Sequence, residues 1–315
     1  MTETRTDCFA GIDIAKHTLD LHIEGITGVT HLTYDEAGLA AACQHLLAAQ
    51  PALIVLEATG GLETRLACEL AAKGLPIAVV NPRQVRDFAK ATGQLAKTDR
   101  IDAQVLSAFA RAVRPQARPP KDVDVRELDE LVTRRRQLID MRVQETLRLG
   151  TATVLQAKSL KKHLAWLDRQ IAALDVDLTG RLRRSEAWRA KEDLLRGIPG
   201  VGSVTCMTLL AKCPELGQLD RREIAALVGL APLANDSGKH RGKRFVWGGR
   251  AEVRAVLYMA TVAAIRCNPV IKAFALRLKA AGKPAKVVIT ACMRKLLTIM
   301  NAMLKSNVPW NTHAA

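Results

Sequence analysis

The stretch Phe9-Ala-Gly-Ile-Asp-Ile-Ala15 sets one acid, Asp13, inside an otherwise apolar run. A second apolar run, Leu53-Ile-Val-Leu-Glu57, ends on another acid, Glu57. Short apolar runs of this length are typical of buried β-strands. An acid that ends a buried strand is costly unless positive charge pairs with it. Asp13 and Glu57 are therefore the first candidates for a site that holds a cation.

Two further acids, Asp99 and Asp102, lie three residues apart in Lys97-Thr-Asp-Arg-Ile-Asp-Ala103, so a helix would carry both on one face. Two carboxylates about 4 Å apart repel each other by roughly 4 kcal/mol at an effective dielectric constant near 20. A cluster of four would be unstable alone, but it suits a hard divalent cation, which takes oxygen ligands. The alternative is four unrelated surface acids among the 31 acidic residues of the chain.

The order of the expected elements decides whether these acids can meet. Strands are expected over residues 8–15, 19–23, 29–34, 52–56 and 76–80, and helices over 35–49, 60–73, from 81 onward and over 98–113. A meander of three strands followed by β-α-β units is the topology of the ribonuclease-H-like fold. There the first and fourth strands lie side by side, so Asp13 would meet Glu57, and a later helix would bring Asp99 and Asp102 beneath them. We predict an α/β domain with a mixed sheet, followed by mostly helical regions.

The balance of charge points to a polyanion as partner. The 315 residues, enough for about two domains of roughly 150 residues, include 47 Lys and Arg against 31 acids, a net charge of +16. Aromatic residues make up only 3%, so stacking of bases on aromatic rings is not expected to dominate binding of nucleic acid. The sequence has no apolar stretch of about 18 residues, no signal-peptide pattern and no Cys-x-x-Cys pair among its seven cysteines. We expect a cytoplasmic protein with reduced thiols, no zinc site and no membrane span.

A long helical stretch is expected over residues 122–192, after a linker at residues 116–120. Six apolar residues within it repeat at spacings of four and three, as in a coiled-coil seam: Leu160, Leu164, Leu167, Ile171, Leu174 and Leu178. This seam could pair with another subunit or with the apolar residues of the preceding helix, Leu128, Leu131, Leu138 and Met141. An ordinary amphipathic helix packed on its own core explains the spacing equally well.

A glycine-rich turn near residue 200 resembles a helix-hairpin-helix element. It reads Leu194-Leu-Arg-Gly-Ile-Pro-Gly-Val-Gly202, and the helical stretch Val204–Leu210 follows it. In such an element the hairpin, here with Gly200 and Gly202, turns backbone N–H groups at a helix start toward phosphate. A plain helical turn is the alternative.

A serine in a basic loop is a further candidate for the chemistry. Ser237 lies in Asn235-Asp-Ser-Gly238, and the cations Lys239, Arg241, Lys243 and Arg244 follow it closely. A serine must lose its proton to attack, and nearby cations stabilise the alkoxide and the phosphorane. However, this composition is common in turns, and a basic loop can simply contact phosphate. Together with Arg250, these cations are the best candidates for contacts with nucleic acid.

These segments together resemble the DEDD transposases of bacterial insertion sequences, the insertion-sequence-110 family, across nearly the full chain. The N-terminal half carries the family pattern in Gly11-Ile-Asp-Ile-Ala-Lys16, Leu56-Glu-Ala-Thr-Gly60, Asn81-Pro-Arg-Gln-Val85 and Lys97-Thr-Asp-Arg-Ile-Asp-Ala103. The C-terminal half carries it in Ile198-Pro-Gly-Val-Gly202, Leu227-Val-Gly-Leu-Ala-Pro232, Ser237-Gly238, Gly248-Gly-Arg250 and Leu257-Tyr-Met-Ala260.

The resemblance implies three regions. They are a RuvC-like, ribonuclease-H-like DEDD domain over residues 1–117, a helical coiled-coil region over 118–191, and a mostly helical C-terminal transposase domain over 192–315 that contains the helix-hairpin-helix element. The resemblance also implies an element-encoded guide RNA, and DNA partners at the element ends and the target. It further implies a homodimer that becomes a tetramer on nucleic acid in the bacterial nucleoid.

For the site, the resemblance implies that a tetrad holds Mg²⁺, with Mn²⁺ as a substitute, and that a serine is the nucleophile. The tetrad consists of Asp13, Glu57, Asp99 and Asp102, and the serine is Ser237. The serine would attack a DNA phosphodiester and leave a 5′-phosphoserine link and a free 3′-hydroxyl. One alternative is a Mg²⁺-dependent nuclease that resembles a Holliday-junction resolvase and uses water. The other is a non-enzymatic nucleic-acid-binding protein whose acids are structural.

Overall fold

The computed structural model describes residues 7–94, 96, 98–118, 120, 122–238 and 240–311. The chain divides into two units, Met1–Lys121 and Asp122–Ala315, here called the sheet unit and the helical unit. Each unit has hydrophobic cores of its own.

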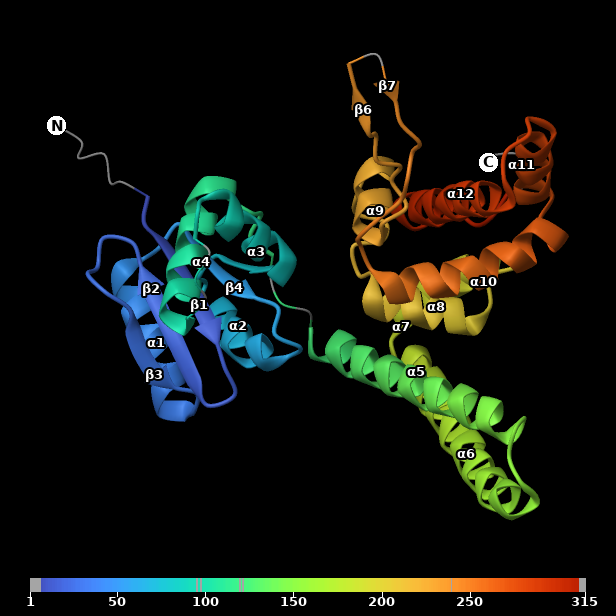
Figure 1. Cartoon of the computed structure of the whole chain (residues 1–315), viewed down its shortest axis with the longest axis horizontal. Coiled ribbons are helices and arrows are strands. Elements are labelled where there is room, and N and C mark those ends of the chain that lie inside the picture. The colour runs from blue at the N-terminus through green and yellow to red at the C-terminus, as the bar shows by residue number, and fades with distance from the viewer. Residues whose placement is uncertain are drawn as a thin grey trace. The chain divides into compact units, whose positions relative to one another are not determined.

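Five strands form the sheet of the first unit: β1 (Phe9–Ile14), β2 (Thr18–Ile23), β3 (Thr30–Thr33), β4 (Leu53–Glu57) and β5 (Ile77–Val80). Their order across the sheet is β3-β2-β1-β4-β5 (Figure 1). β1, β2 and β3 form an antiparallel meander, whereas β4 pairs parallel with both β1 and β5. The predicted mixed sheet is confirmed, and it is compatible with a ribonuclease-H-like fold.

Helices cover both faces of this sheet: α1 (Glu36–Ala49), α2 (Leu62–Ala72), α3 (Pro82–Ala91) and α4 (Asp99–Val113). Ile12 of β1 and Leu56 of β4 pack in the core that α1 and α2 share with the sheet. The core on the opposite face is formed with α3 and α4. Because side chains alternate along a strand, Asp13 and Glu57, one residue further on, point to the face of α3 and α4.

A glycine in β1 allows α4 to lie directly on the sheet. A Cβ atom added at Gly11 would lie 2.3 Å from the backbone nitrogen of Ser107 and 2.4 Å from the carbonyl oxygen of Ala103. Real Cβ atoms are not found this close to a backbone, so only glycine fits between β1 and α4. This contact fixes the height of α4 above the strand that carries Asp13.

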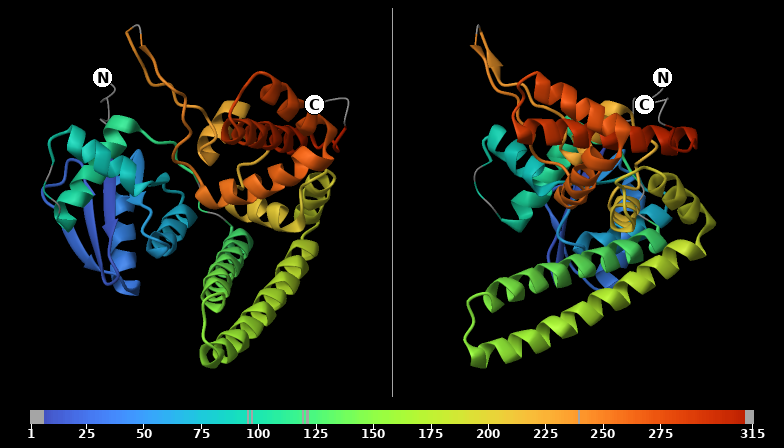
Figure 2. Two further views of the ribbon diagram at one scale, coloured as in Figure 1. Left: turned by 45° about the vertical axis from the view of Figure 1, so that its right-hand side comes forward. Right: turned by 90° about the vertical axis from the view of Figure 1, so that its right-hand side faces the viewer.

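The long helical stretch is divided into α5 (Val123–Leu149), α6 (Val154–Arg184) and α7 (Glu186–Arg196). α5 and α6 run side by side in opposite directions (Figure 2). Ion pairs join them at matching heights, Arg135 with Asp175 at 2.5 Å and Arg142 with Asp168 at 2.5 Å. The seam residue Leu167 is fully buried. The apolar seam of α6 therefore faces α5 of the same chain.

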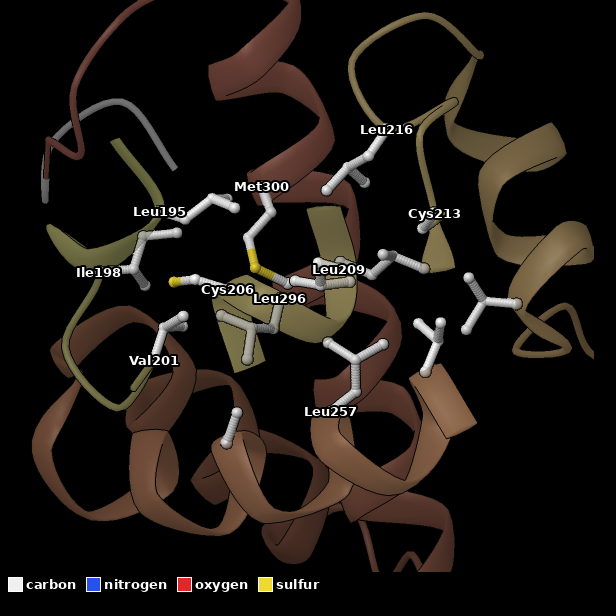
Figure 3. Close-up of a cluster of buried hydrophobic side chains, with 14 of the residues drawn as sticks. Leu195, Ile198, Val201, Cys206, Leu209, Cys213, Leu216, Leu257, Leu296 and Met300 are labelled. Carbon is white, nitrogen blue, oxygen red and sulfur yellow. The ribbon is translucent and has the colours of Figure 1, made fainter. Parts of the chain in front are cut away.

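The remaining elements build one core in the helical unit: α8 (Ser203–Lys212), α9 (Arg221–Val228), β6 (Asp236–Ser237), β7 (His240–Arg241), α10 (Ala251–Cys267), α11 (Pro269–Ala280) and α12 (Ala285–Ser306). Figure 3 shows Leu195, Cys206, Leu257 and Met300 meeting in its centre. Residues of α5 and α6, such as Leu128, join the same core. The helical pair is thus rooted in the C-terminal helices.

One helix among the described residues, α12, is long and apolar enough to cross a membrane by length and composition, and α10 with α11 meets this test only as a bent pair. No apolar stretch of this length is expected from the sequence. Val288, Leu296 and Met300 of α12 lie in the core of the helical unit. Packing in this core accounts for the apolar character of the helix.

Candidate active site

Two neighbouring parallel strands bring Asp13 and Glu57 to the same edge of the sheet. The pairing of β1 with β4 sets Ile12 opposite Leu56. Asp13 and Glu57 each follow these partners by one residue, so both carboxylates leave the sheet side by side on the same face. Both side chains are half-buried. This is the neighbourhood that the strand order predicts.

Asp102 reaches the same place from α4. It lies one turn before Leu106, whose side chain is buried in the core between α4 and the sheet. Residues four apart share a helix face, so Asp102 turns toward the sheet as well. Asp13, Glu57 and Asp102 together line one cavity of about 600 Å³ in the sheet unit. The side chain of Asp99, the fourth member of the predicted set, lies outside the described residues.

The donor set of this cavity fits a hard divalent cation. Carboxylate oxygens are the ligands that Mg²⁺ prefers, and this ion usually keeps several waters and binds one or two carboxylates together with substrate phosphate. Within the described part of the chain, no three acidic, histidine or cysteine side chains converge closely enough to enclose an ion. Asp13, Glu57 and Asp102 thus share a cavity without forming a closed metal cage among the described residues.

A polar row across the sheet contains an acid that the sequence analysis did not single out. Asp20 of β2 lies opposite Asp13, and His31 of β3 lies opposite Asp20. Asp20 is 3% exposed and accepts a hydrogen bond of 2.9 Å from Nδ1 of His31. A strand is expected over residues 19–23, but this expectation does not tell which side chains of the strand face the covered side of the sheet. The pairing of β2 with β1 decides this.

The candidate nucleophile lies on a different kind of element. Ser237 belongs to the short strand β6, where it pairs with His240 of β7. Gly238 follows in a left-handed conformation with φ of +55°, as a tight turn requires. Lys239 lies outside the described residues. The hairpin extends beyond the helices of the unit (Figures 1 and 2), and Ser237 is exposed.

The cations near the serine differ in their surroundings. Arg244 forms a two-pronged ion pair with Asp236, at 2.6 and 2.8 Å, and this hydrogen bonding lowers the pKa of Asp236. Arg241 pairs with Asp236 through the backbone of the hairpin, but the side chains of Arg241 and Lys243 are exposed and form no hydrogen bond or ion pair with another described residue. They are the ones best placed to contact a polyanion.

Arg250 lies at the root of the hairpin and has partners within the protein. Its guanidinium donates to both carboxylate oxygens of Glu215, at 2.5 and 2.6 Å, and to the carbonyl oxygen of Lys212 at 2.9 Å. Burial lowers its pKa, but the hydrogen bonds and charge of Glu215 outweigh burial, so the pKa is raised. The prediction that Arg250 contacts nucleic acid stays untested, and the structure assigns this side chain an internal contact.

Two glycines cross next to this ion pair. A Cβ atom at Gly249 would lie 2.3 Å from the backbone nitrogen of Gly229, and one at Gly229 would lie 2.1 Å from the carbonyl oxygen of Gly248. Arg254 donates to the carbonyl oxygens of Val228, at 2.9 Å, and Gly248. The returning arm of the hairpin is therefore held against the end of α9 by backbone contacts.

One glycine of the turn between α7 and α8 is required for close packing against α10. A Cβ atom at Gly200, whose φ is +96°, would lie 2.6 Å from the backbone of Ala264 in α10. Gly202 is exposed and caps α8 without any side-chain hydrogen bond to the first turn. Gly200 thus serves the contact with α10, whereas Gly202 and the first residues of α8 that follow it are exposed, although most of α8 is buried.

Comparisons with known proteins match transposase families to both the N-terminal and the C-terminal part of the chain. A family model described as a transposase, of the DEDD type, matches residues 10–157, and one described as a transposase of the IS116/IS110/IS902 family matches residues 192–276. Relatives include pilin gene-inverting proteins from Moraxella lacunata and from Moraxella bovis. Each is 26% identical over 318 residues, which covers 96% of this chain and 97% of the relative.

Proposed function

Because the chain belongs to the IS110 family of transposases, an enzyme family that recombines DNA, we propose that it cuts and rejoins DNA strands through a covalent link to Ser237. The observation that carries this proposal is the cavity lined by Asp13, Glu57 and Asp102, which come from three separate segments of the sheet unit. The relatives are named for inverting a pilin gene. Inversion requires both breaking and rejoining of strands, which a serine–phosphate link permits.

The carboxylates are proposed to hold the metal of this reaction. Membership of a DEDD-type family supports dependence on a divalent metal in general, and we propose Mg²⁺, with Mn²⁺ as a substitute. Asp13, Glu57 and Asp102, together with Asp99, would hold it. When bound, the metal supplies a positive charge that polarises the phosphate and stabilises the leaving oxygen. The carboxylates would hold this charge at the end of β1 and β4, where the scissile phosphate would bind.

Ser237 is proposed to supply the nucleophile. Its Oγ loses a proton and forms a bond to phosphorus, and the bond between phosphorus and the 3′-oxygen breaks. The 3′-oxygen takes up a proton and leaves as a hydroxyl. One phosphate ester replaces another, so the energy of the broken link is retained and no ATP is needed. Arg241 and Lys243, exposed on the same hairpin, would stabilise the charge that develops on the phosphate.

The partners of the reaction are also part of the proposal. DNA is the substrate that the family implies, and an element-encoded guide RNA is proposed to select the element ends and the target. The exposed helix start at Gly202 and the cations Lys239, Arg241, Lys243 and Arg244 are proposed to contact nucleic acid. We propose a homodimer that becomes a tetramer on nucleic acid. Residues 1–117 would act as the RuvC-like part, 118–191 as the coiled-coil part and 192–315 as the transposase part.

The test is a search for a covalent protein–DNA adduct. The full chain is incubated with labelled DNA that carries the element's end, the element's RNA and Mg²⁺, and the products are separated on a denaturing gel. Wild-type protein is expected to give a labelled band at the size of the protein. Ser237→Ala and Asp102→Ala are expected to lose the band and recombination, but to keep DNA binding. Ser306→Ala changes another exposed serine of the helical unit and serves as the control.

Strand cleavage that continues without an adduct, and that survives Ser237→Ala, would overturn the serine mechanism. It would favour the alternative, a Mg²⁺-dependent nuclease that resembles a Holliday-junction resolvase and uses water. Cleavage that needs no divalent metal and survives Asp102→Ala would overturn the role of the carboxylates.

A further inference from the structure

The cavity of the carboxylates has a second wall, which is basic. α3 begins at the end of β5, where Asn81 caps the helix by accepting a hydrogen bond from the backbone N–H of Arg83. Arg83, Arg86 and Lys90 of this helix line the same cavity as the acids. Residues spaced by three and four share one helix face. One wall of the cavity therefore carries acids, and the other carries three cations and Asp87.

α3 is held firmly enough to present these cations in a fixed position. Val85 directly precedes Arg86, and Ala89 directly precedes Lys90. Both are buried in the core between α3, α4 and the sheet. Phe88 packs edge-on against Phe109 of α4, with ring centres 5.4 Å apart. The basic wall is thus part of the packed sheet unit and not a loose surface helix.

Two of the cations have no partner among the described residues. Arg86 is half-buried and Lys90 is exposed, and the guanidinium of Arg86 and the ammonium of Lys90 form no hydrogen bond or ion pair with another described residue. Arg83, by contrast, lies 4.0 Å from Asp87. A half-buried arginine gives up hydration, and this cost is normally offset by hydrogen bonds to an anion. Its position across the cavity from the acids suggests that the anion comes from outside the protein.

We infer that Arg86 and Lys90 bind phosphates of the DNA strand next to the bond that is cut, and so position the scissile phosphate over the carboxylates. This inference rests on the proposed function and adds binding residues to it. Carboxylates alone repel the DNA backbone, and cations on the facing wall offset this repulsion at the point where the strand must approach. Contacts to phosphate fix the register of a protein on DNA without reading its sequence.

A purely structural role makes different predictions. If the cations only neutralise the acids, their removal lowers the melting temperature and leaves the binding of DNA as it was. If they bind phosphate, their removal leaves the melting temperature unchanged and weakens both binding and cleavage. The two roles are therefore separated by measurements on the same variants.

The experiment compares Arg86→Gln, Lys90→Gln and the double variant with Lys73→Gln, an exposed cation of the same unit that does not line this cavity. Binding of the full chain to a short fluorescent duplex is measured between about 50 and 200 mM salt. The double variant is expected to lose up to about 2 from the slope of log affinity against log salt, about 1 for each phosphate contact. It is also expected to cut DNA roughly 100-fold more slowly. Lys73→Gln should leave the salt slope and the cleavage rate as in wild type, and all variants should keep the wild-type melting temperature. Arg86→Lys should restore part of the slope.

Asp102→Ala distinguishes failure of this inference from failure of the proposed function. If the double variant binds and cuts like wild type while Asp102→Ala is inactive, the inference is wrong and the carboxylate site stands. A double variant that melts earlier with an unchanged salt slope overturns the inference as well, because the cations are then structural. If Asp102→Ala is also fully active, the carboxylate site itself is wrong.

Discussion

The carboxylate cavity and the serine hairpin are built in opposite ways. The cavity lies where two parallel strands end and two helices pack on the sheet, so each acid is attached to an element that is packed in the core of the sheet unit. The hairpin carries Ser237 on exposed arms and is held at its root by the crossing of Gly229 with Gly249 and by Arg250 and Arg254. A metal site needs ligands fixed to within a fraction of an ångström. A nucleophile on an exposed arm can instead be brought to its substrate by the nucleic acid.

The comparison predicts that the cavity is the part most sensitive to packing. Gly11→Ala would place a methyl group inside the backbone of α4, at 2.3 Å from the nitrogen of Ser107. Overpacking of this kind typically costs 1–3 kcal/mol and can cost more, so we expect a loss of about 3 kcal/mol in the free energy of unfolding. Strand cleavage should fall with it, because α4 carries Asp102 away from Asp13. Chemical unfolding followed by a cleavage assay measures both effects. Unchanged stability would show that α4 can shift freely, against the view of a rigid cavity.

The root of the hairpin offers a matched pair of glycines. Gly248 and Gly249 have similar φ values, +72° and +67°, but a Cβ atom meets nothing within 4 Å at Gly248 and meets Gly229 at Gly249. Alanine at either position incurs about 1–2 kcal/mol for the left-handed backbone. Only Gly249→Ala should also displace the hairpin, with a loss of recombination of roughly 100-fold relative to Gly248→Ala. Equal activity of the two variants would mean that the crossing does not position Ser237.

Substitution of Arg250 distinguishes two roles for this side chain, an internal anchor of the hairpin and a contact to DNA. As an anchor, Arg250→Gln and Glu215→Gln should each lower the free energy of unfolding of the helical unit by about 2 kcal/mol, since each breaks charged hydrogen bonds. The salt dependence of DNA binding should stay as in wild type for Arg250→Gln. Thermal unfolding and salt titrations measure these two quantities. A salt slope reduced by about 1 with unchanged stability would instead support the contact with nucleic acid that the sequence predicts.

A smaller effect is expected from pH in the sheet unit. His22 lies opposite Gly11 in the sheet, and its Nδ1 is 2.6 Å from the hydroxyl oxygen of Ser107 in α4. Burial lowers the pKa of His22 below 6.5, although Glu24 opposes this. The folded state therefore binds the proton less well than the unfolded state. The contribution of neutral His22 to the free energy of unfolding is fully present above about pH 6.5. It is lost as the pH falls from there through the folded-state pKa.

The measurement is the free energy of unfolding between pH 7 and 5 for wild type and His22→Gln, which removes the titrating group and keeps a polar partner for Ser107. Wild type should lose more stability over this range than the variant. Parallel curves for the two proteins would assign the loss to other groups.

Much of the sheet unit could be predicted from its sequence, because its signals are local. Apolar runs and turn residues between them set the five strands, and the acids at their ends identify Asp13 and Glu57 as candidates. The burial of Asp20 could not be predicted in this way. It depends on which face of β2 is covered by α4, and that is a property of strand register and helix position.

Less of the helical unit could be predicted from its sequence, because its structure depends more on contacts between distant segments. The spacing of the leucines in α6 predicts a partner but not which one, and the structure supplies α5 of the same chain. The breaks after residue 149 and at Ser185 have local signals: Thr153 and Ser185 cap the helices that follow. The apolar repeat between them favoured one long helical stretch in the sequence, so the breaks were not predicted. Arg250 is predicted to contact nucleic acid because it is a cation close to Ser237 in the sequence, and the sequence does not show that Glu215 lies beside it.

The sequence by itself determined the positive charge that suits DNA, the strands and the acids at their ends, because these follow from composition and from periodicity over short distances. The family followed from the resemblance of its motifs, which are also short stretches of sequence. Tertiary structure alone decided which charged groups share a cavity and which neutralise each other. Electrostatic interactions depend on distance in space, and residues such as Arg86 and Asp13, or Arg250 and Glu215, come together only when the chain has folded.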